Sequence, residues 1–120
     1  SPIINGDGNY SRDFTYIDNV IQANLLSLVT TNKKAINTVY NVAYGERNTL
    51  NDLMRYLKEY LSDFDYKISN VTVIYGPKRA GDIPHSHASV TKAKENLNYS
   101  PQFSLQKGLK EAVKWYWNNL

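Results

Sequence analysis

The stretch PIINGDGNYSRDFTYIDNV, residues 2–20, contains a strand signal, a turn and a helix start, and this order recurs along the chain. Its apolar start, PIIN, predicts a short strand, and the Gly-Asp-Gly that follows predicts a turn that ends it. Near its end the sequence changes to helical spacing, and Thr15 with Asp18 three residues later is typical of a helix N-terminal cap. Arg12 and Asp13 lie between the predicted strand and the predicted helix. The role of this charged pair is not evident from the stretch alone.

Strand and helix signals alternate along the remaining residues. NTVYNVAYG (37–45) and NVTVIYGP (70–77) are rich in β-branched and aromatic residues and predict two further strands, the first of them largely buried. Apolar residues at helical spacing predict helices from Ile17, from Thr49 with Asp52 as its capping partner, from about Ser89 to Leu97, and from Ser104. In the last helix we expect Tyr116 and Trp117 to continue the apolar stripe into the core.

This order predicts an α/β fold with about three short strands and four helices, and a sheet that is parallel in part. Three short strands make a small sheet, and the apolar segment 37–45 needs neighbours on both edges and cover on both faces. We therefore expect the chain to be a piece of a larger α/β protein. Left alone, its open strand edges favour association with a second copy, and we expect a homo-oligomer.

Composition restricts the class of protein. With 42% hydrophobic and 21% charged residues, the 120-residue chain is typical of one globular domain. The net charge is only +3 and acidic residues are interleaved with basic ones, which disfavours a nucleic-acid partner. There is no cysteine, in keeping with a cytoplasmic protein, and no apolar run long enough to span a membrane. His85 and His87 have no third ligand at suitable spacing, so no metal site is expected.

Two short motifs carry candidate chemistry, and each has a plain structural alternative. Arg12 follows the glycine turn and suits a phosphate group, but it could instead pair with Asp13 or Asp18 at the surface. In the loop KRAGDIPHS (78–86), Arg79 suits a phosphate and Asp82 a sugar hydroxyl, but the two could also be an i,i+3 ion pair. The Gly-Asp-Gly turn is not a dinucleotide fingerprint, because its third glycine position is occupied by serine.

Taken together, the blocks GDG…SRDFTYIDNV, YNVAYGERNTLNDL, RAGDIPHS and TKAKENLNYSPQFSLQKGLKEAVKWY resemble the carboxyl-terminal part of extended short-chain dehydrogenases/reductases. These are the NAD-dependent nucleotide-sugar epimerases and dehydratases, with an extended Rossmann-type fold. The blocks occur in the family's order over nearly the whole chain, so residues 1–120 are interpreted as the substrate-binding segment of such an enzyme. Within the family the sequence looks closest to UDP-N-acetylglucosamine 4-epimerases of bacterial polysaccharide precursor synthesis.

The resemblance implies roles for five residues. The arginine of the family's RDF block, here Arg12, and that of its R-x-G-D block, here Arg79, hold the nucleotide diphosphate. The aspartate of the second block, here Asp82, holds the ribose hydroxyls, and the residue before the glycine turn, here Asn5, lies near the uracil. Ser86 falls on a position beside the sugar that is large in enzymes restricted to UDP-glucose and small in those that accept N-acetylated sugars.

The family's glycine-rich NAD loop and its Tyr-x-x-x-Lys catalytic group do not occur in these residues. The resemblance therefore implies NAD as the cofactor of a full-length enzyme, bound by an N-terminal half that this sequence does not contain. No catalytic residue is assigned here, and the chain alone is expected to be inactive. Alternatives are a non-catalytic binding or assembly module of the same fold, another nucleotide-sugar epimerase, dehydratase or decarboxylase, and, ranked last, a basic nucleic-acid binder.

Overall fold

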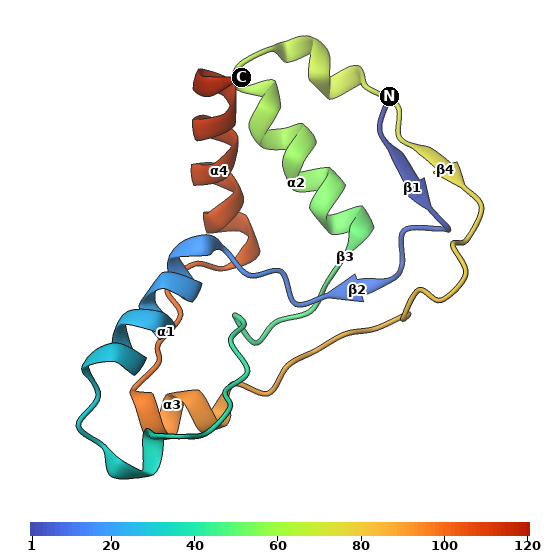
Figure 1. Cartoon of the computed structure of the whole chain (residues 1–120). Helices are drawn as coiled ribbons and strands as arrows, with labels where there is room; N and C mark the ends of the chain where they lie inside the picture. Colours follow the sequence, from blue (N-terminus) through green and yellow to red (C-terminus); the bar gives the residue numbers. More distant parts are fainter.

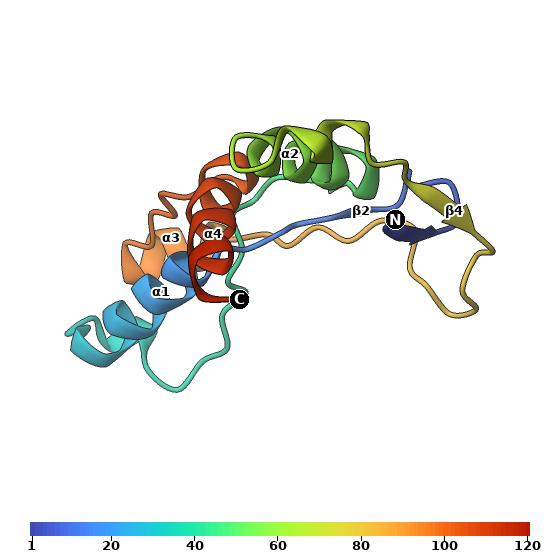
Figure 2. The same ribbon diagram turned by 90° about the horizontal axis from the view of Figure 1, so that it is seen from above.

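The computed structural model describes all residues from Ser1 to Leu120 and has the shape of a thin, curved plate of about 53 × 35 × 19 Å (Figure 1, Figure 2). One end carries α1 and α3, the middle carries α2 and α4, and the far end carries β1 and β4. The four helices are α1 (Ile17–Val29), α2 (Leu50–Ser62), α3 (Thr91–Leu97) and α4 (Leu105–Asn119). The strands are β1 (Ile3–Asn5), β2 (Ser11–Arg12), β3 (Asn48–Thr49) and β4 (Ile74–Gly76), and two 3₁₀ turns cover Lys33–Ala35 and Tyr66–Asn70.

The strands pair in two small sheets, which confirms an α/β fold that is parallel in part. β1 lies parallel to β4, with Ile3 opposite Ile74, and β2 lies antiparallel to β3, with Ser11 opposite Thr49. A further parallel bridge joins Ser11 to His85, in the loop after β4. These pairings place β1, β2 and the loop after β4 next to one another, although they are far apart in the sequence.

Two of the predicted helix caps are confirmed and one is wrong. The hydroxyl of Thr49 accepts a hydrogen bond from the backbone of Asp52, whose carboxylate accepts one from the Thr49 backbone, and Ser104 caps α4. At α1 the capping position is Tyr16, which makes no side-chain cap bond; Thr15 lies one residue before the cap, and its hydroxyl donates to the carbonyl of Asp13. α3 begins at Thr91, slightly later than expected.

The buried strand expected over residues 37–45 does not form. This segment is irregular; Val39 in it is 84% exposed, whereas Ala43 is buried and accepts a 2.7 Å hydrogen bond from the Tyr99 hydroxyl. A strand requires a neighbour for its N–H and C=O groups, and none of the four strands pairs with this segment. The strand expected over 70–77 is shorter than predicted, since β4 begins only at Ile74.

The core is small and lies where α1 and α3 meet the segment before Gly45. Its members are mostly small side chains, namely Ala23, Ala43, Val90, Ala93 and Tyr99. The expectation that Tyr116 and Trp117 are buried is wrong, since they are 55% and 44% exposed. The reason is that α4 packs chiefly on α2, so the last turns of α4 are open to solvent apart from a stacking contact between Trp117 and Phe64.

Candidate ligand-binding site

Four of the five residues singled out in the sequence line one pocket of about 310 Å³. Asn5 comes from the end of β1, Arg12 from β2, and Arg79 and Asp82 from the loop after β4. The rest of the lining consists of apolar and aromatic side chains from β1, the segment after the glycine turn and the start of α2: Ile3, Ile4, Tyr10, Leu50, Leu53 and Met54. Two arginines therefore share a partly apolar space that is large enough for part of a small ligand.

Backbone pairing explains why these residues meet. The parallel pairing of β1 with β4 ends with Asn5 opposite Gly76, so the loop after β4 starts beside the glycine turn after β1. Further along, the Ser11 N–H donates to the Pro84 carbonyl (2.9 Å), and the Ser86 N–H donates to the Ser11 carbonyl (3.1 Å). The loop is thus held at both ends against β1 and β2. Polar side chains beyond the carboxyl ends of parallel strands are where α/β folds bind ligands.

Arg12 has no carboxylate partner in the structure. Its Nη1 donates to the carbonyl of Ser11 at 2.8 Å, and it makes no ion pair with Asp13 or Asp18. The surface pairing considered as the alternative for Arg12 is therefore wrong. A guanidinium has five N–H donors in a planar fork, so most of the donors of Arg12 remain available for an anion in the pocket.

Arg79 and Asp82 do form the i,i+3 pair that was the alternative for this loop, and both still line the pocket. Arg79 Nε and Nη2 donate to Asp82 Oδ1 at 3.0 and 2.8 Å, and these hydrogen bonds, followed by the charge of Asp82, raise the pKa of Arg79. The Arg79 side chain is 71% exposed, so the pair contributes little to stability. The two hydrogen bonds instead orient the Arg79 guanidinium group beside the pocket. The other carboxylate oxygen, Asp82 Oδ2, makes no hydrogen bond within the chain.

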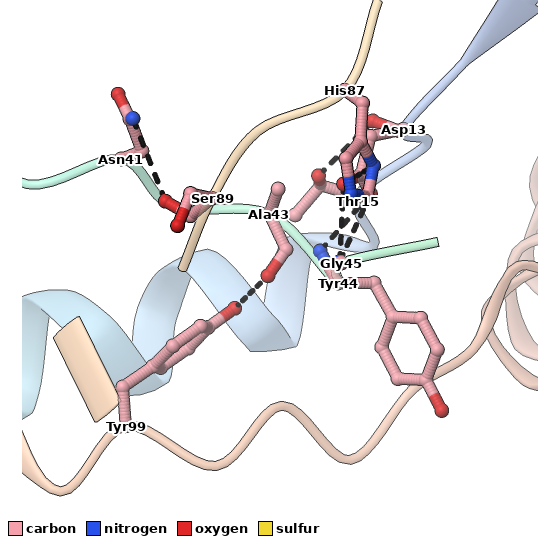
Figure 3. Close-up of polar contacts among 9 residues, drawn as sticks. All are labelled: Asp13, Thr15, Asn41, Ala43, Tyr44, Gly45, His87, Ser89 and Tyr99. Carbon is pink, nitrogen blue, oxygen red and sulfur yellow. Dashed lines mark hydrogen bonds and ion pairs between the residues drawn. The ribbon is translucent and has the colours of Figure 1, made fainter. Parts of the chain in front are cut away.

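Asp13, an expected surface partner of Arg12 in the alternative interpretation, is instead a buried side chain that joins two segments of the chain (Figure 3). Its side chain is 5% exposed, and its carboxylate accepts hydrogen bonds from the backbone N–H groups of Tyr44 (3.2 Å) and Gly45 (3.0 and 3.2 Å). His87 Nδ1 lies 3.7 Å from Asp13 Oδ2. Asp13 thereby ties the chain after β2 to the segment before β3. The only signal of this contact in the sequence was a glycine at the end of an apolar run, Gly45, and in the structure its φ is positive.

The fifth residue, Ser86, is not part of the pocket lining. Its side chain is exposed and its backbone N–H is bonded to Ser11, the neighbour of Arg12, so it lies beside the site and not in it. The adjacent His85 shares a 2.8 Å hydrogen bond with the Ser11 hydroxyl, a contact that the sequence did not predict. A second pocket of about 200 Å³, between α4 and residues 14–16, has no cationic lining and does not suit an anion. No helix of the structure is long and apolar enough to cross a membrane.

Comparison with known proteins identifies a family match and similar solved structures. Residues 1–112 match the family model described as GDP-mannose 4,6 dehydratase. A putative UDP-glucose 4-epimerase of Methanocaldococcus jannaschii is 34% identical over 99% of this chain and 35% of its own length. A UDP-N-acetylglucosamine 4-epimerase of Methanobrevibacter ruminantium, solved with UDP-N-acetylmuramic acid, is 34% identical with a TM-score of 0.85, over 100% of this chain and 36% of that one.

A third similar protein is the UDP-glucuronic acid 4-epimerase of Bacillus cereus, solved with UDP-glucuronic acid and NAD. It is 30% identical with a TM-score of 0.77, over 97% of this chain and 36% of that one. The sequence thus spans about a third of the length of the relatives it matches. The three similar enzymes act on or bind UDP-sugars that differ in the sugar.

Proposed function

Because the chain belongs to the GDP-mannose 4,6-dehydratase family, within the extended short-chain dehydrogenases/reductases, we propose that residues 1–120 are the UDP-sugar-binding portion of a longer NAD-dependent 4-epimerase. The observation that carries this proposal is the convergence of Arg12 and Arg79 on one pocket. A nucleoside diphosphate has adjacent anionic phosphates, and guanidinium forks bind such oxygens in pairs. Two arginines from different segments, β2 and the loop after β4, can together hold a pyrophosphate in a fixed orientation.

The other pocket residues fit the remaining parts of a UDP group. Asp82 Oδ2, with no partner in the chain, is suited to accept hydrogen bonds from ribose hydroxyls. Asn5 carries an amide at the end of β1, and an amide matches the donors and acceptors of a uracil edge. The apolar wall from the start of α2, including Leu53 and Met54, limits the water around the phosphates and so strengthens their attraction to the arginines.

The two motifs that would bind NAD and supply the catalytic tyrosine are absent from this sequence. The turn after β1 has glycines at positions 6 and 8 but serine where the dinucleotide fingerprint needs its third glycine, and no tyrosine is followed by a lysine four residues later. We propose that the residues that bind NAD and perform the epimerisation lie in parts of the longer protein outside this sequence. The role of this chain is to keep the UDP group anchored while the sugar is turned.

For the sugar, we propose UDP-N-acetylglucosamine as the preferred substrate, with UDP-glucose and UDP-glucuronate as the alternatives. The support is steric: Ser86 is small and exposed and is hydrogen-bonded to the neighbour of Arg12, which leaves room for an acetamido group beside the diphosphate. Ser86→Tyr in the full-length enzyme should abolish activity on the N-acetylated sugar and preserve activity on UDP-glucose. Equal loss on both sugars would argue against a role for Ser86 in specificity.

The UDP-binding role is tested by calorimetric titration of the longer protein with UDP. Arg12→Ala and Arg79→Ala should each weaken UDP binding by roughly 10- to 100-fold, because a hydrogen bond to a charged group contributes about 1.5–3 kcal/mol. Arg47→Ala is the matched control, since it removes the same charge from an exposed arginine outside this pocket. Unchanged affinity in both pocket variants would refute the proposal. The 120-residue chain alone should bind UDP no better than millimolar and show no turnover.

A further inference from the structure

We propose that Asn51, near the start of α2, is a positioning residue that sets the distance between the two arginine-bearing sides of the UDP-sugar pocket. This inference rests on the proposed function of that pocket. Asn51 is not among the residues that line the pocket, and although it falls within the block YNVAYGERNTLNDL, the resemblance implies no role for it. Its side chain instead joins the glycine turn after β1 to β4, which are the segments that lead to Arg12 and to Arg79.

The first set of contacts fixes the glycine turn. Asn51 Nδ2 donates to the carbonyl of Asp7 (3.1 Å) and to Asn9 Oδ1 (3.3 Å), and the Asn51 backbone N–H donates to the Gly8 carbonyl (3.0 Å). The approach is so close that a Cβ built on Gly8 would lie 2.0 Å from Asn51 Oδ1. The residue before Asn51 adds a further bond: the Leu50 N–H donates to the Tyr10 carbonyl (3.1 Å), and both of these residues line the pocket.

The second contact reaches the other side of the pocket. The hydroxyl of Tyr75, on β4, donates to Asn51 Oδ1 at 2.9 Å. Asn51 thus uses the donor end of its amide on the turn that precedes Arg12 and the acceptor end on the strand that precedes Arg79. Only an amide of this length satisfies both ends, because a carboxylate has no donor and an aliphatic side chain has neither group.

A positioning role differs from a purely structural one in what each predicts for Asn51→Asp. The aspartate keeps the shape and the acceptor for Tyr75, and its charge is favourable in the first turn of a helix, so the melting temperature should stay within about 2 °C. It loses the donors to Asp7 and Asn9, and its oxygen repels theirs, so the turn should move away from α2. All residues that line the pocket would then still be present, but the distance between the segments that carry Arg12 and Arg79 would change.

The experiment uses the full-length enzyme with UDP-sugar as substrate and UDP as the binding probe. For Asn51→Asp we expect the KM and the UDP dissociation constant to rise by about 3- to 10-fold, the value of one or two lost hydrogen bonds, with kcat within about twofold. Amide hydrogen exchange of residues 6–10 should quicken without ligand. Tyr75→Phe, which removes only the bond to Oδ1, should show the same direction of change in KM.

Asn24→Asp is the matched control, because Asn24 is exposed on α1 and its side chain makes no hydrogen bond in the structure. It should leave both constants unchanged. If Arg12→Ala and Arg79→Ala weaken UDP binding and Asn51→Asp does not, the positioning inference alone is refuted. If the arginine variants bind UDP normally, the proposed function fails first. If Asn51→Asp raises KM only together with a clear fall in melting temperature, Asn51 has a purely structural role and the inference is overturned.

Discussion

Replacing Asn19 tests how far α1 depends on one buried amide. Asn19 is 0% exposed, and its side chain makes three hydrogen bonds to the segment before α4. Its Nδ2 donates to the Phe103 carbonyl (2.8 Å), and its Oδ1 accepts from the N–H groups of Gln102 (2.9 Å) and Phe103 (3.1 Å). Asn19→Ala leaves all three backbone groups without a protein partner, next to a cavity the size of an amide.

The magnitude follows from the number of bonds and their burial. Each bond contributes about 1 kcal/mol net, and a buried polar group left unsatisfied costs about 1–3 kcal/mol. A water molecule that enters the new cavity can restore part of this, since it would find three polar groups to bond. We therefore expect Asn19→Ala to lower the free energy of unfolding by about 2–4 kcal/mol.

Gln22, one turn later on α1, provides the matched comparison. Its amide also brackets the same segment, donating to the Ser100 carbonyl and accepting from the Ser100 N–H, both at 2.8 Å, but at an exposed position. Water replaces these bonds directly, so Gln22→Ala should cost less than about 1 kcal/mol. The assay is equilibrium urea unfolding with the m-value held as a check on the unfolded state. Equal losses in the two variants would refute the argument that burial decides the cost, since Asn19 also makes one more bond than Gln22.

Three further predictions concern the caps, the glycine turn and the free surfaces. Hydrogen bonds from Thr49 lower the pKa of Asp52 in the folded state. The stabilisation from this carboxylate is therefore present above its unfolded pKa near 4 and is lost as the pH falls through the lower folded value. Thr49→Ala should lower the free energy of unfolding by about 1 kcal/mol at neutral pH and by progressively less in acid, as measured by urea unfolding across pH. Gly8→Ala should destabilise more than Gly81→Ala in thermal unfolding, because both have positive φ (+78° and +85°) but only Gly8 would place its Cβ against Asn51; equal shifts would contradict this. The 120-residue chain should self-associate in sedimentation experiments through its open strand edges and exposed apolar side chains, and a monomer over a wide concentration range would count against it.

Local signals in the sequence predicted the helices well. The Thr49 and Ser104 caps act within one turn of their own helix, so the residue types at fixed spacing contain the information. The cap predicted at Thr15 is wrong because α1 begins at Ile17, which makes Tyr16 the capping residue and leaves Thr15 one residue outside the helix end. The spacing of suitable residues predicts where a helix starts only to within a residue or two.

Strands were harder to predict because each depends on a partner. The segment 37–45 has the composition of a buried strand, yet with no strand of this chain beside it only Ala43 and its neighbours are packed, and Val39 is exposed. The same reasoning explains Tyr116 and Trp117. They do continue the apolar face of α4, but α2 packs against that face only over part of its length. Periodicity predicts which face of an element is apolar, whereas burial requires that something else be placed against that face.

The candidate site lies between these two cases. The residue types and their order suggested Arg12, Arg79 and Asp82 through resemblance, but nothing local in the sequence says that the two arginines share a pocket. Their proximity depends on the parallel pairing of β1 with β4 and on the bridge from Ser11 to His85, which are contacts between distant segments. Asp13 and Asn51 were missed for the same reason, since their partners lie across the fold. If the pocket binds a diphosphate as proposed, its affinity depends on these distant backbone contacts as much as on the arginines, so weakening the contacts that hold the loop after β4 should reduce UDP binding with both guanidinium groups intact.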